Sequence, residues 1–457
     1  MKKVAIGLAC LMAAFLMSST SCTKAEGYDV AAYVWPAYHN DPRWAEIGIF
    51  PDGKGEWETL YNSEPRYEGH RQPRVPEWGY FDEADPKMQE KIIRTATKYG
   101  VNTFIFDWYW YDGRPFLEDV VNAFLKARNN GKMKFYLMWA NHTANSYWDR
   151  LEPDKSKVYW RGETSRESFD SFTSHLIEDY FKRPNYYRID GKPVFAIYEL
   201  GTFIDGMGGL AEAKDALDSF RAQCEEAGLG GLHVQAILWN IPTTLAGVPG
   251  ETESTQNNTL KALGIESLTH YQWCHYVPLK DYQEWGEEAV SKYAQFDSEY
   301  EVPYFPNVSV DWDNNPRFPY QVGAVTGVTP ERFKGFLETA KEYADAHPEQ
   351  PKLVTINAWN EWSEGSYLEP DTVYGYKFLE AVRDVFCRYG SLPGRTSRQM
   401  ATGGPSHCVG HFFFRVNHPL GHTVRHMPAG GPSHCVGPFP FREPMPPAGM
   451  CLTACRV

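Results

Sequence analysis

The stretch Leu353-Val-Thr-Ile-Asn-Ala-Trp-Asn-Glu-Trp-Ser-Glu364 joins a short apolar strand directly to two glutamates three positions apart. Its first four residues are apolar or β-branched, as in a strand that is buried on both faces. Glu361 and Glu364 follow that strand, with Trp359 and Trp362 beside them. Carboxylates at the carboxyl end of a buried strand suit proton transfer at a glycosidic bond. The same glutamates in a solvated surface loop would have no such role. The pattern in the rest of the chain distinguishes a catalytic site from a surface loop.

The same unit, an apolar strand and then a helical pattern, recurs along the body of the chain. We expect strands at Val30–Val34, Thr103–Asp107, Lys134–Trp139, Val194–Tyr198, His233–Leu238, Ser267–Tyr271, Tyr304–Val308 and Leu353–Ile356. We expect helices at Pro86–Tyr99, Pro115–Asn129, Ser168–Phe181, Leu210–Ala227, Gln256–Leu263, Glu284–Tyr300, Pro330–Ala346 and Val373–Arg383. Eight such units predict an α/β fold, a (β/α)8 TIM barrel with long βα loops. A doubly wound open sheet is the alternative, but Val34-Trp-Pro-Ala-Tyr38 after the first strand is not a glycine-rich turn.

In a TIM barrel the residues that follow the strands meet at one mouth. Aromatic residues stand beside polar ones at nearly every such position, which favours a site over a surface loop. The predicted catalytic residues are Glu361 and Glu364, and the predicted substrate-binding residues are Trp35, Tyr38, His39, Asp107, Trp108, Tyr109, Trp139, Asn141, Glu199, Asp311, Asp313, Arg317, Trp359, Asn360 and Trp362. Further residues at these strand ends are His142, Tyr198, Trp239, Asn240, Gln272, Trp273 and His275. Each polar residue can equally fix a loop by hydrogen bonding, and this alternative stays open.

Four motifs resemble the WbsX-like proteins, relatives of the endo-α-mannosidases and endo-α-mannanases of glycoside hydrolase family 99. They are Tyr33-Val-Trp-Pro-Ala-Tyr38, Phe106-Asp-Trp-Tyr109, Asp311-Trp-Asp-Asn-Asn-Pro-Arg317 and Asn360-Glu-Trp-Ser-Glu-Gly365. The resemblance covers residues 28 to 386 and implies a (β/α)8 barrel. It also implies a reaction in which Glu361 takes the proton of the sugar's 2-hydroxyl, which attacks C1 to give a 1,2-anhydro sugar. Glu364 would act first as the acid and then as the base. Family 99 usually has His at the position of Ser363, so the sugar and the linkage do not carry over.

The residues themselves leave other chemistry open. An ordinary two-carboxylate hydrolase takes its acids from different loops, and Glu199, Asp107, Asp311 or Asp313 would then be the partner of Glu364. A glycosyltransferase is a second possibility, because Asp311-Trp-Asp313 has the Asp-x-Asp form that can hold a metal and a nucleotide diphosphate. A non-catalytic glycan-binding lipoprotein is a third, and it would need the aromatic residues but not both glutamates. The sequence predicts no cofactor and no metal-ligand set.

Composition narrows the range of partners. The net charge of −13 argues against nucleic acid or anionic lipid as the main partner. The chain holds 15 Trp, 28 Tyr and 26 Phe, more aromatic residues than a core usually requires. Carbohydrate binding is one use for them, and a thick barrel wall is another. We therefore expect a carbohydrate substrate, and the oligomeric state is not indicated.

The two ends of the chain differ from its body. Lys2 and Lys3 precede an apolar run from Val4 to Met17, small residues and then Cys22, as in the signal peptide of a bacterial lipoprotein. We expect a leader at 1–22, a barrel like that of glycoside hydrolase family 99 at 23–387 and an atypical tail at 388–457. The protein would then be exported and held at a membrane, periplasmic or at the cell surface, only by a lipid on Cys22.

The tail has seven arginines, one acidic residue and a repeated Gly-Gly-Pro-Ser-His-Cys-Val-Gly, at 403–410 and 430–437. This composition predicts disorder. We assign the tail no function, and it is consistent with an out-of-frame extension of the gene.

Overall fold

The computed structural model describes residues 27–245 and 250–387. The predicted leader, the predicted lipidation site at Cys22 and the predicted tail lie outside the described residues. Among the described helices, none is both long enough and apolar enough to cross a membrane.

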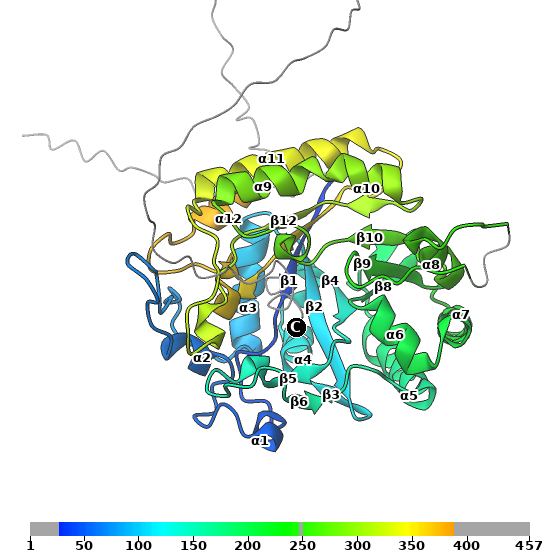
Figure 1. Ribbon diagram of the computed structural model, residues 1–457, viewed down its shortest axis with the longest axis horizontal. Coiled ribbons are helices and arrows are strands. Elements are labelled where there is room, and N and C mark those ends of the chain that lie inside the picture. The colour runs from blue at the N-terminus through cyan, green and yellow to red at the C-terminus, as the bar shows by residue number, and fades with distance from the viewer. Residues whose placement is uncertain (1–26, 246–249, 388–457) are drawn as a thin grey trace, which may run out of the picture. The chain divides into compact units, whose positions relative to one another are not determined.

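Parallel strands form a ring in the same order as they occur in the chain (Figure 1). They are β1 (Asp29–Val34), β2 (Thr103–Tyr111), β4 (Lys134–Trp139), β8 (Lys192–Ile197), β9 (His233–Ile237), β10 (Ser267–Thr269), β11 (Tyr304–Phe305), β12 (Asn307–Ser309) and β13 (Leu353–Asn357). β11 pairs with β10 and β12 pairs with β13, so the two are parts of one strand interrupted at Pro306. β13 in turn pairs with β1, which closes the ring. The predicted (β/α)8 barrel is confirmed, and each predicted strand is present.

Helices follow the strands and cover the outside of the ring (Figure 1). They are α3 (Pro86–Lys98), α4 (Asp119–Lys126), α5 (Arg166–Leu176), α7 (Leu210–Glu226), α8 (Gln256–Leu263), α9 (Tyr282–Ser291), α10 (Tyr293–Glu299), α11 (Pro330–Ala346) and α12 (Lys377–Phe386). α8 and α11 have the predicted bounds. The helix predicted at Glu284–Tyr300 is in fact two helices, α9 and α10.

Long loops carry short elements that the hydrophobic pattern did not predict. They are α1 (Trp44–Ile47), α2 (Trp57–Tyr61), β3 (Arg114–Phe116), β5 (Ala144–Asn145), β6 (Val158–Trp160), β7 (Arg188–Ile189), α6 (Leu200–Met207), β14 (Asn360–Glu361) and β15 (Ser366–Tyr367). Short 3₁₀ turns include η2 (Ser146–Trp148), η4 (Trp273–His275), η5 (Asn315–Arg317) and η6 (Trp362–Glu364). The loop from β1 to α3 alone runs from residue 35 to residue 85. These loops build the mouth of the barrel.

Side chains of each strand alternate between the inside and the outside of the ring. On β2, Asp107 and Tyr109 line an interior pocket. Trp108 and Trp110 point outward and lie edge-on to Phe172 of α5, with ring centroids 5.4 and 5.8 Å away. Neighbouring residues at the end of one strand therefore lie in two environments, the pocket inside the ring and the packing layer between the ring and its helices.

Candidate active site

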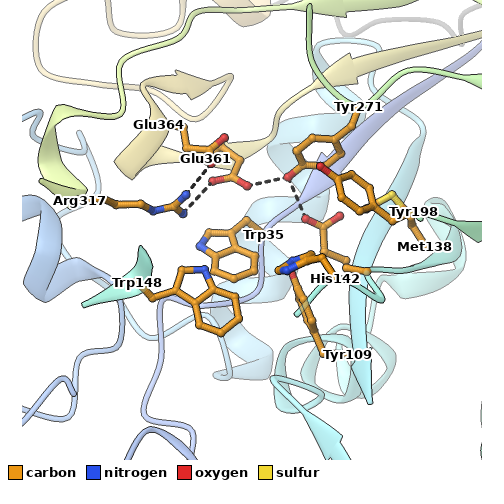
Figure 2. A pocket seen from close by; sticks show the side chains of 12 residues that line it. Trp35, Tyr109, Met138, His142, Trp148, Tyr198, Tyr271, Arg317, Glu361 and Glu364 are labelled. Carbon is orange, nitrogen blue, oxygen red and sulfur yellow. Dashed lines mark hydrogen bonds and ion pairs between the residues drawn. The ribbon is translucent and has the colours of Figure 1, made fainter. Parts of the chain in front are cut away.

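A small pocket lies at the carboxyl ends of the barrel strands (Figure 2). Its lining is aromatic and acidic, with one arginine. The lining residues are Trp35, Asp107, Tyr109, Met138, Ala140, His142, Trp148, Tyr198, Tyr271, Arg317, Glu361 and Glu364. Both predicted catalytic glutamates line this pocket, together with four of the predicted substrate-binding residues: Trp35, Asp107, Tyr109 and Arg317.

The two glutamates lie on one side of a tight turn. Glu361 ends β14 and Glu364 ends η6, which has three residues per turn, so side chains three apart are eclipsed. The hydroxyl of Tyr38 accepts the backbone N–H groups of Trp362 and Ser363 at 2.9 and 3.2 Å. Tyr38 does not line the pocket, but it fixes the turn that presents the glutamates.

Arg317 is the only cationic side chain that lines this pocket. Its Nη1 donates to Glu364 Oε1 at 2.5 Å, and its Nη2 lies 3.6 Å from Glu361 Oε2. The same guanidinium binds both oxygens of Glu56, at 2.7 and 3.1 Å. One positive charge thus faces three buried glutamates.

Burial raises the pKa of Glu361 well above its usual range, and the charge of Glu364 raises it further. Burial also raises the pKa of Glu364, although Arg317 opposes the shift. Burial and the repulsion between the two carboxylates therefore disfavour the state in which both are ionised. An acid and a base side by side are what general acid–base catalysis requires.

Tyr271 connects Glu361 to a third acid. Its hydroxyl lies 2.6 Å from Glu361 Oε1 and 2.9 Å from Asp107 Oδ2, as the dashed lines in Figure 2 show. One hydroxyl hydrogen cannot serve two carboxylates, so one of the two acids must donate a proton to the tyrosine oxygen. Burial raises the pKa of Asp107 well above its usual range, and no described cationic group forms an ion pair with it. Arg317 opposes the corresponding shift at Glu361, so we expect Asp107 to hold this proton and Tyr271 to donate to Glu361.

Three carboxyl oxygens in the pocket have no hydrogen-bond partner within the described part of the chain. They are Asp107 Oδ1, Glu361 Oε2 and Glu364 Oε2. Unpartnered buried oxygens are costly to a fold and are rare unless a ligand or solvent completes them. The pocket thus presents three oxygens that can bind the hydroxyl groups of a ligand.

Four predicted tryptophans lie outside the pocket. The indole N–H groups of Trp359 and Trp362 each donate to one oxygen of Glu369, both at 2.8 Å. Burial raises the pKa of Glu369 to about 8. Trp108 and Trp139 project outward from their strands, against Phe172 of α5. These four indoles support the barrel and are not placed to contact a ligand in the pocket.

Two predicted asparagines tie neighbouring strand ends together. Asn360 accepts the N–H of Trp35 and donates to its carbonyl, both at 2.8 Å. Asn141 does the same to Glu199, again at 2.8 Å for each bond. Glu199 itself is half-buried at the mouth and does not line the pocket. The alternative of loop fixing, which the sequence left open, holds for both asparagines.

The remaining predicted residues are also buried away from the pocket. His39 lies 4.0 Å from Asp41. Asp311 binds Arg74 at 2.9 Å. Asp313 accepts hydrogen bonds from four side chains: His70 at 2.8 Å, Gln72 at 2.8 Å, Arg74 at 3.3 Å and Asn315 at 2.8 Å. The Asp-x-Asp pair is therefore engaged by protein groups. Within residues 27–245 and 250–387, no three His, Cys, Asp or Glu side chains are grouped so as to hold a metal ion.

Several pocket residues were absent from the predicted site. Met138, Ala140 and Tyr271 were not predicted from the sequence. Each lies two positions after another inward-facing residue, so the alternation of side chains along a strand could have identified them. His142 and Tyr198 were noted only as strand-end residues. Trp148 comes from η2 in the loop after β4, and no sequence pattern marks it.

Comparison with known families and proteins gives a consistent result. A family model described as glycosyltransferase WbsX matches residues 30–382. WxcX of Xanthomonas campestris pv. campestris is 28% identical over 371 residues, which cover 79% of this chain and 50% of that protein. WxcX from a second strain matches to the same extent. The chain thus spans about half the length of these curated relatives.

Solved structures share the fold. One is a family 99 endo-alpha-mannosidase from Bacteroides thetaiotaomicron in complex with bis-tris-propane, with a TM-score of 0.51 and 13% identity. The match covers 78% of this chain and 95% of that one. A glycoside hydrolase-like protein gives a TM-score of 0.50 at 16% identity, covering 79% and 94%. At such low identity these similarities establish the barrel and nothing finer.

Proposed function

We propose that this chain, which belongs to the WbsX family, acts on glycans and hydrolyses a glycosidic bond with Glu361 and Glu364 as the catalytic pair. The observation that carries the proposal is the set of three unpartnered carboxyl oxygens, two of them from eclipsed glutamates, that face one pocket. Sugar hydroxyls are suitable partners for such oxygens, and a carboxyl group whose pKa is raised can give a proton to a glycosidic oxygen. The proposed substrate is a polysaccharide with α-mannosidic or related linkages.

In the proposed reaction Glu361 takes the proton from the 2-hydroxyl of the sugar, and O2 attacks C1. The bond from C1 to the leaving oxygen breaks, and Glu364 gives that oxygen its proton. Water then opens the 1,2-anhydro sugar, Glu364 accepts the proton of the water, and Glu361 returns its proton to O2. The hydroxyl of Tyr271 supports this assignment, because a donor at 2.6 Å favours the ionised form of Glu361. Burial raises the pKa of both glutamates, and the assignment of Glu364 as the acid follows the resemblance to glycoside hydrolase family 99.

The test is product formation by the full chain on mannans and bacterial surface polysaccharides. We expect released oligosaccharides whose new reducing end first appears, by ¹H NMR, with the anomeric configuration of the substrate. Glu364→Gln should abolish the release, whereas Glu342→Gln, at an exposed helical position, should not change it. Inversion of configuration would contradict participation of the 2-hydroxyl, and release that survives Glu364→Gln would remove this residue from the role.

A glycosyltransferase is the second candidate, because the family model carries that description. Its support in the sequence was Asp311 and Asp313, whose oxygens already bind Arg74, His70 and Gln72. We therefore rank hydrolysis first. Release of nucleoside diphosphate from a nucleotide sugar, dependent on a glycan acceptor and lost in Asp313→Asn, would reverse that order. A glycan-binding protein without activity would give binding but neither kind of product.

We also propose that the protein is an exported lipoprotein anchored through Cys22. The support is the order of charged, apolar and small residues before that cysteine. Cells fed an alkyne-labelled fatty acid should incorporate the label into the wild-type protein and not into Cys22→Ser. A wild-type protein that stays unlabelled in the cytoplasm would contradict the anchor.

A further inference from the structure

We propose a second carbohydrate-binding subsite beside the pocket, formed by Trp239, Glu199 and Asn240, that holds the sugar next to the one being cleaved. The inference rests on the proposed function of the pocket and extends it. It requires an aromatic surface, a free acceptor and a wall shared with the pocket, and each of these is present.

The aromatic surface is Trp239, which follows β9. Its indole stacks on His275 with ring centroids 4.3 Å apart and an interplanar angle of 30°. Its N–H donates to Glu199 Oε1 at 3.3 Å. The side chain is held at two points and is nevertheless only half-buried. A fixed indole with a solvent-facing portion gains free energy when the C–H face of a sugar covers it.

The acceptor is Glu199, whose backbone is held by Asn141. Its carboxylate accepts hydrogen bonds from Thr202 at 2.5 Å and from Trp239. An ionised carboxylate has about four acceptor positions, so two remain for sugar hydroxyls. Asn240 is exposed beside it, and its carbonyl accepts the N–H of Gly201 at 3.1 Å. The amide of Asn240 thus adds a donor and an acceptor next to the carboxylate.

Two residues connect the proposed subsite to the pocket. Tyr198 lines the pocket, and its hydroxyl lies 3.2 Å from Nε2 of His275, the imidazole on which Trp239 stacks. His142 also lines the pocket and lies close enough for the charge of Glu199 to act on its pKa, which burial lowers. On the other side of the pocket, Arg317 and Glu56 are buried and paired. A ligand that extends beyond the pocket therefore has half-buried polar and aromatic groups to meet on the side of Glu199.

The consequence concerns the substrate. A site that binds one ring in the pocket and the next ring on Trp239 gains affinity from each, so the preferred ligand has at least two linked sugars. Glu199, which the sequence placed among the substrate-binding residues, takes its role here and not in the catalytic pocket.

The experiment is calorimetric binding to the full chain with Glu364→Gln, which prevents turnover, using α-linked manno-oligosaccharides of one to four residues. We expect the tetrasaccharide to bind at least about tenfold more tightly than the monosaccharide. Adding Trp239→Ala should lower the affinity for the longer ligands by about tenfold and leave the affinity for mannose unchanged. Glu199→Gln should act in the same direction, since it weakens hydrogen bonds made by a charged group.

Trp78→Ala is the matched control, because Trp78 is also half-buried and its indole donates to Tyr376 at 3.0 Å. It should bind every length as the parent does. Affinity that does not grow with length, or that grows equally in Trp239→Ala, overturns the subsite, and cleavage by the wild-type chain then still supports the proposed function. Binding that depends on length and on Trp239, without cleavage of any substrate, supports the subsite and counts against hydrolysis.

Discussion

Asp313 and the three acids of the pocket are all buried at the mouth of the barrel, but they differ in how many of their carboxyl oxygens have hydrogen-bond partners. Asp313 accepts hydrogen bonds from four side chains, and we call it and its partners His70, Gln72, Arg74 and Asn315 the Arg74 cluster. The pocket acids Asp107, Glu361 and Glu364 each retain an unpartnered oxygen. The backbone connects the two groups, since the N–H of Asp313 donates to the carbonyl of Glu364 at 2.6 Å.

The difference in bonding has an electrostatic counterpart. Burial opposes the charge of Asp313, but the hydrogen bond from His70 and the guanidinium of Arg74 lower its pKa below the usual range. Burial raises the pKa of Glu361, and the neighbouring Glu364 raises it further. The surroundings of Asp313 thus favour its charged form, whereas burial in the pocket disfavours the charged form of Glu361. Burial alone therefore does not distinguish the two groups; the unmet hydrogen bonds and raised pKa of the pocket acids do.

The largest expected effect is in the pocket. Glu361→Gln or Glu364→Gln should lower kcat by about 10²–10⁴-fold, the usual contribution of a general acid or base. The melting temperature should change little, because the lost attraction to Arg317 is offset by relief of the repulsion between the glutamates, and Arg317 keeps Glu56. Initial rates and thermal melts on the same samples check this. A variant that retains full activity would place the chemistry on other residues.

The opposite signature is expected in the Arg74 cluster. Asp313→Ala should lower the free energy of unfolding by about 1–3 kcal/mol, because buried donors lose their acceptor, although Arg74 keeps Asp311. Urea unfolding measures this loss, and activity per folded molecule should change little. Glu342→Ala, at an exposed position, serves as the control. If Asp313→Ala abolished activity and left stability intact, the cluster would belong to the active site.

A smaller effect is expected at the tyrosine between Asp107 and Glu361. Tyr271→Phe removes the hydrogen bond to Glu361, which is worth about 1.5–3 kcal/mol when one partner is charged, so kcat/KM should fall by about 10–100-fold. Loss of that donor disfavours the ionised form of Glu361 and so raises its pKa further. A base must be ionised, so the acid limb of the pH–rate profile should move to higher pH. An unchanged limb would show that Glu361 is not the base.

The smallest effect is expected at Asp107. An asparagine can donate to the oxygen of Tyr271 just as a protonated aspartic acid does, so Asp107→Asn should stay within a few-fold of the wild-type rate. Asp107→Ala lacks that donor and should resemble Tyr271→Phe. Steady-state kinetics of the three variants compare them directly. If Asp107→Asn were as damaging as Asp107→Ala, Asp107 would act as a carboxylate and not as a proton holder.

The sequence pattern predicted the architecture more reliably than it predicted the lining of the pocket. Each predicted strand is present, since an apolar run bounded by turns is a local signal. The rule that assigned strand-end aromatics to the site was less selective, because Trp108 and Tyr109 are adjacent in sequence and point to opposite sides of β2. Trp359 and Trp362 were expected at the ligand and instead hold Glu369.

The sequence by itself determined the barrel and the glutamate pair. Eight apolar strands that alternate with helices bury both faces of a sheet in few ways, and a spacing of three fixes two side chains on one side of a turn. Only the tertiary structure decided which acids are free to act. The partner of Asp313 is Arg74, 239 positions away, and the partner of Asp107 is Tyr271, 164 positions away. Hydrogen bonds between such distant segments leave no local pattern, and they separate an acid that holds a loop from one that faces the pocket.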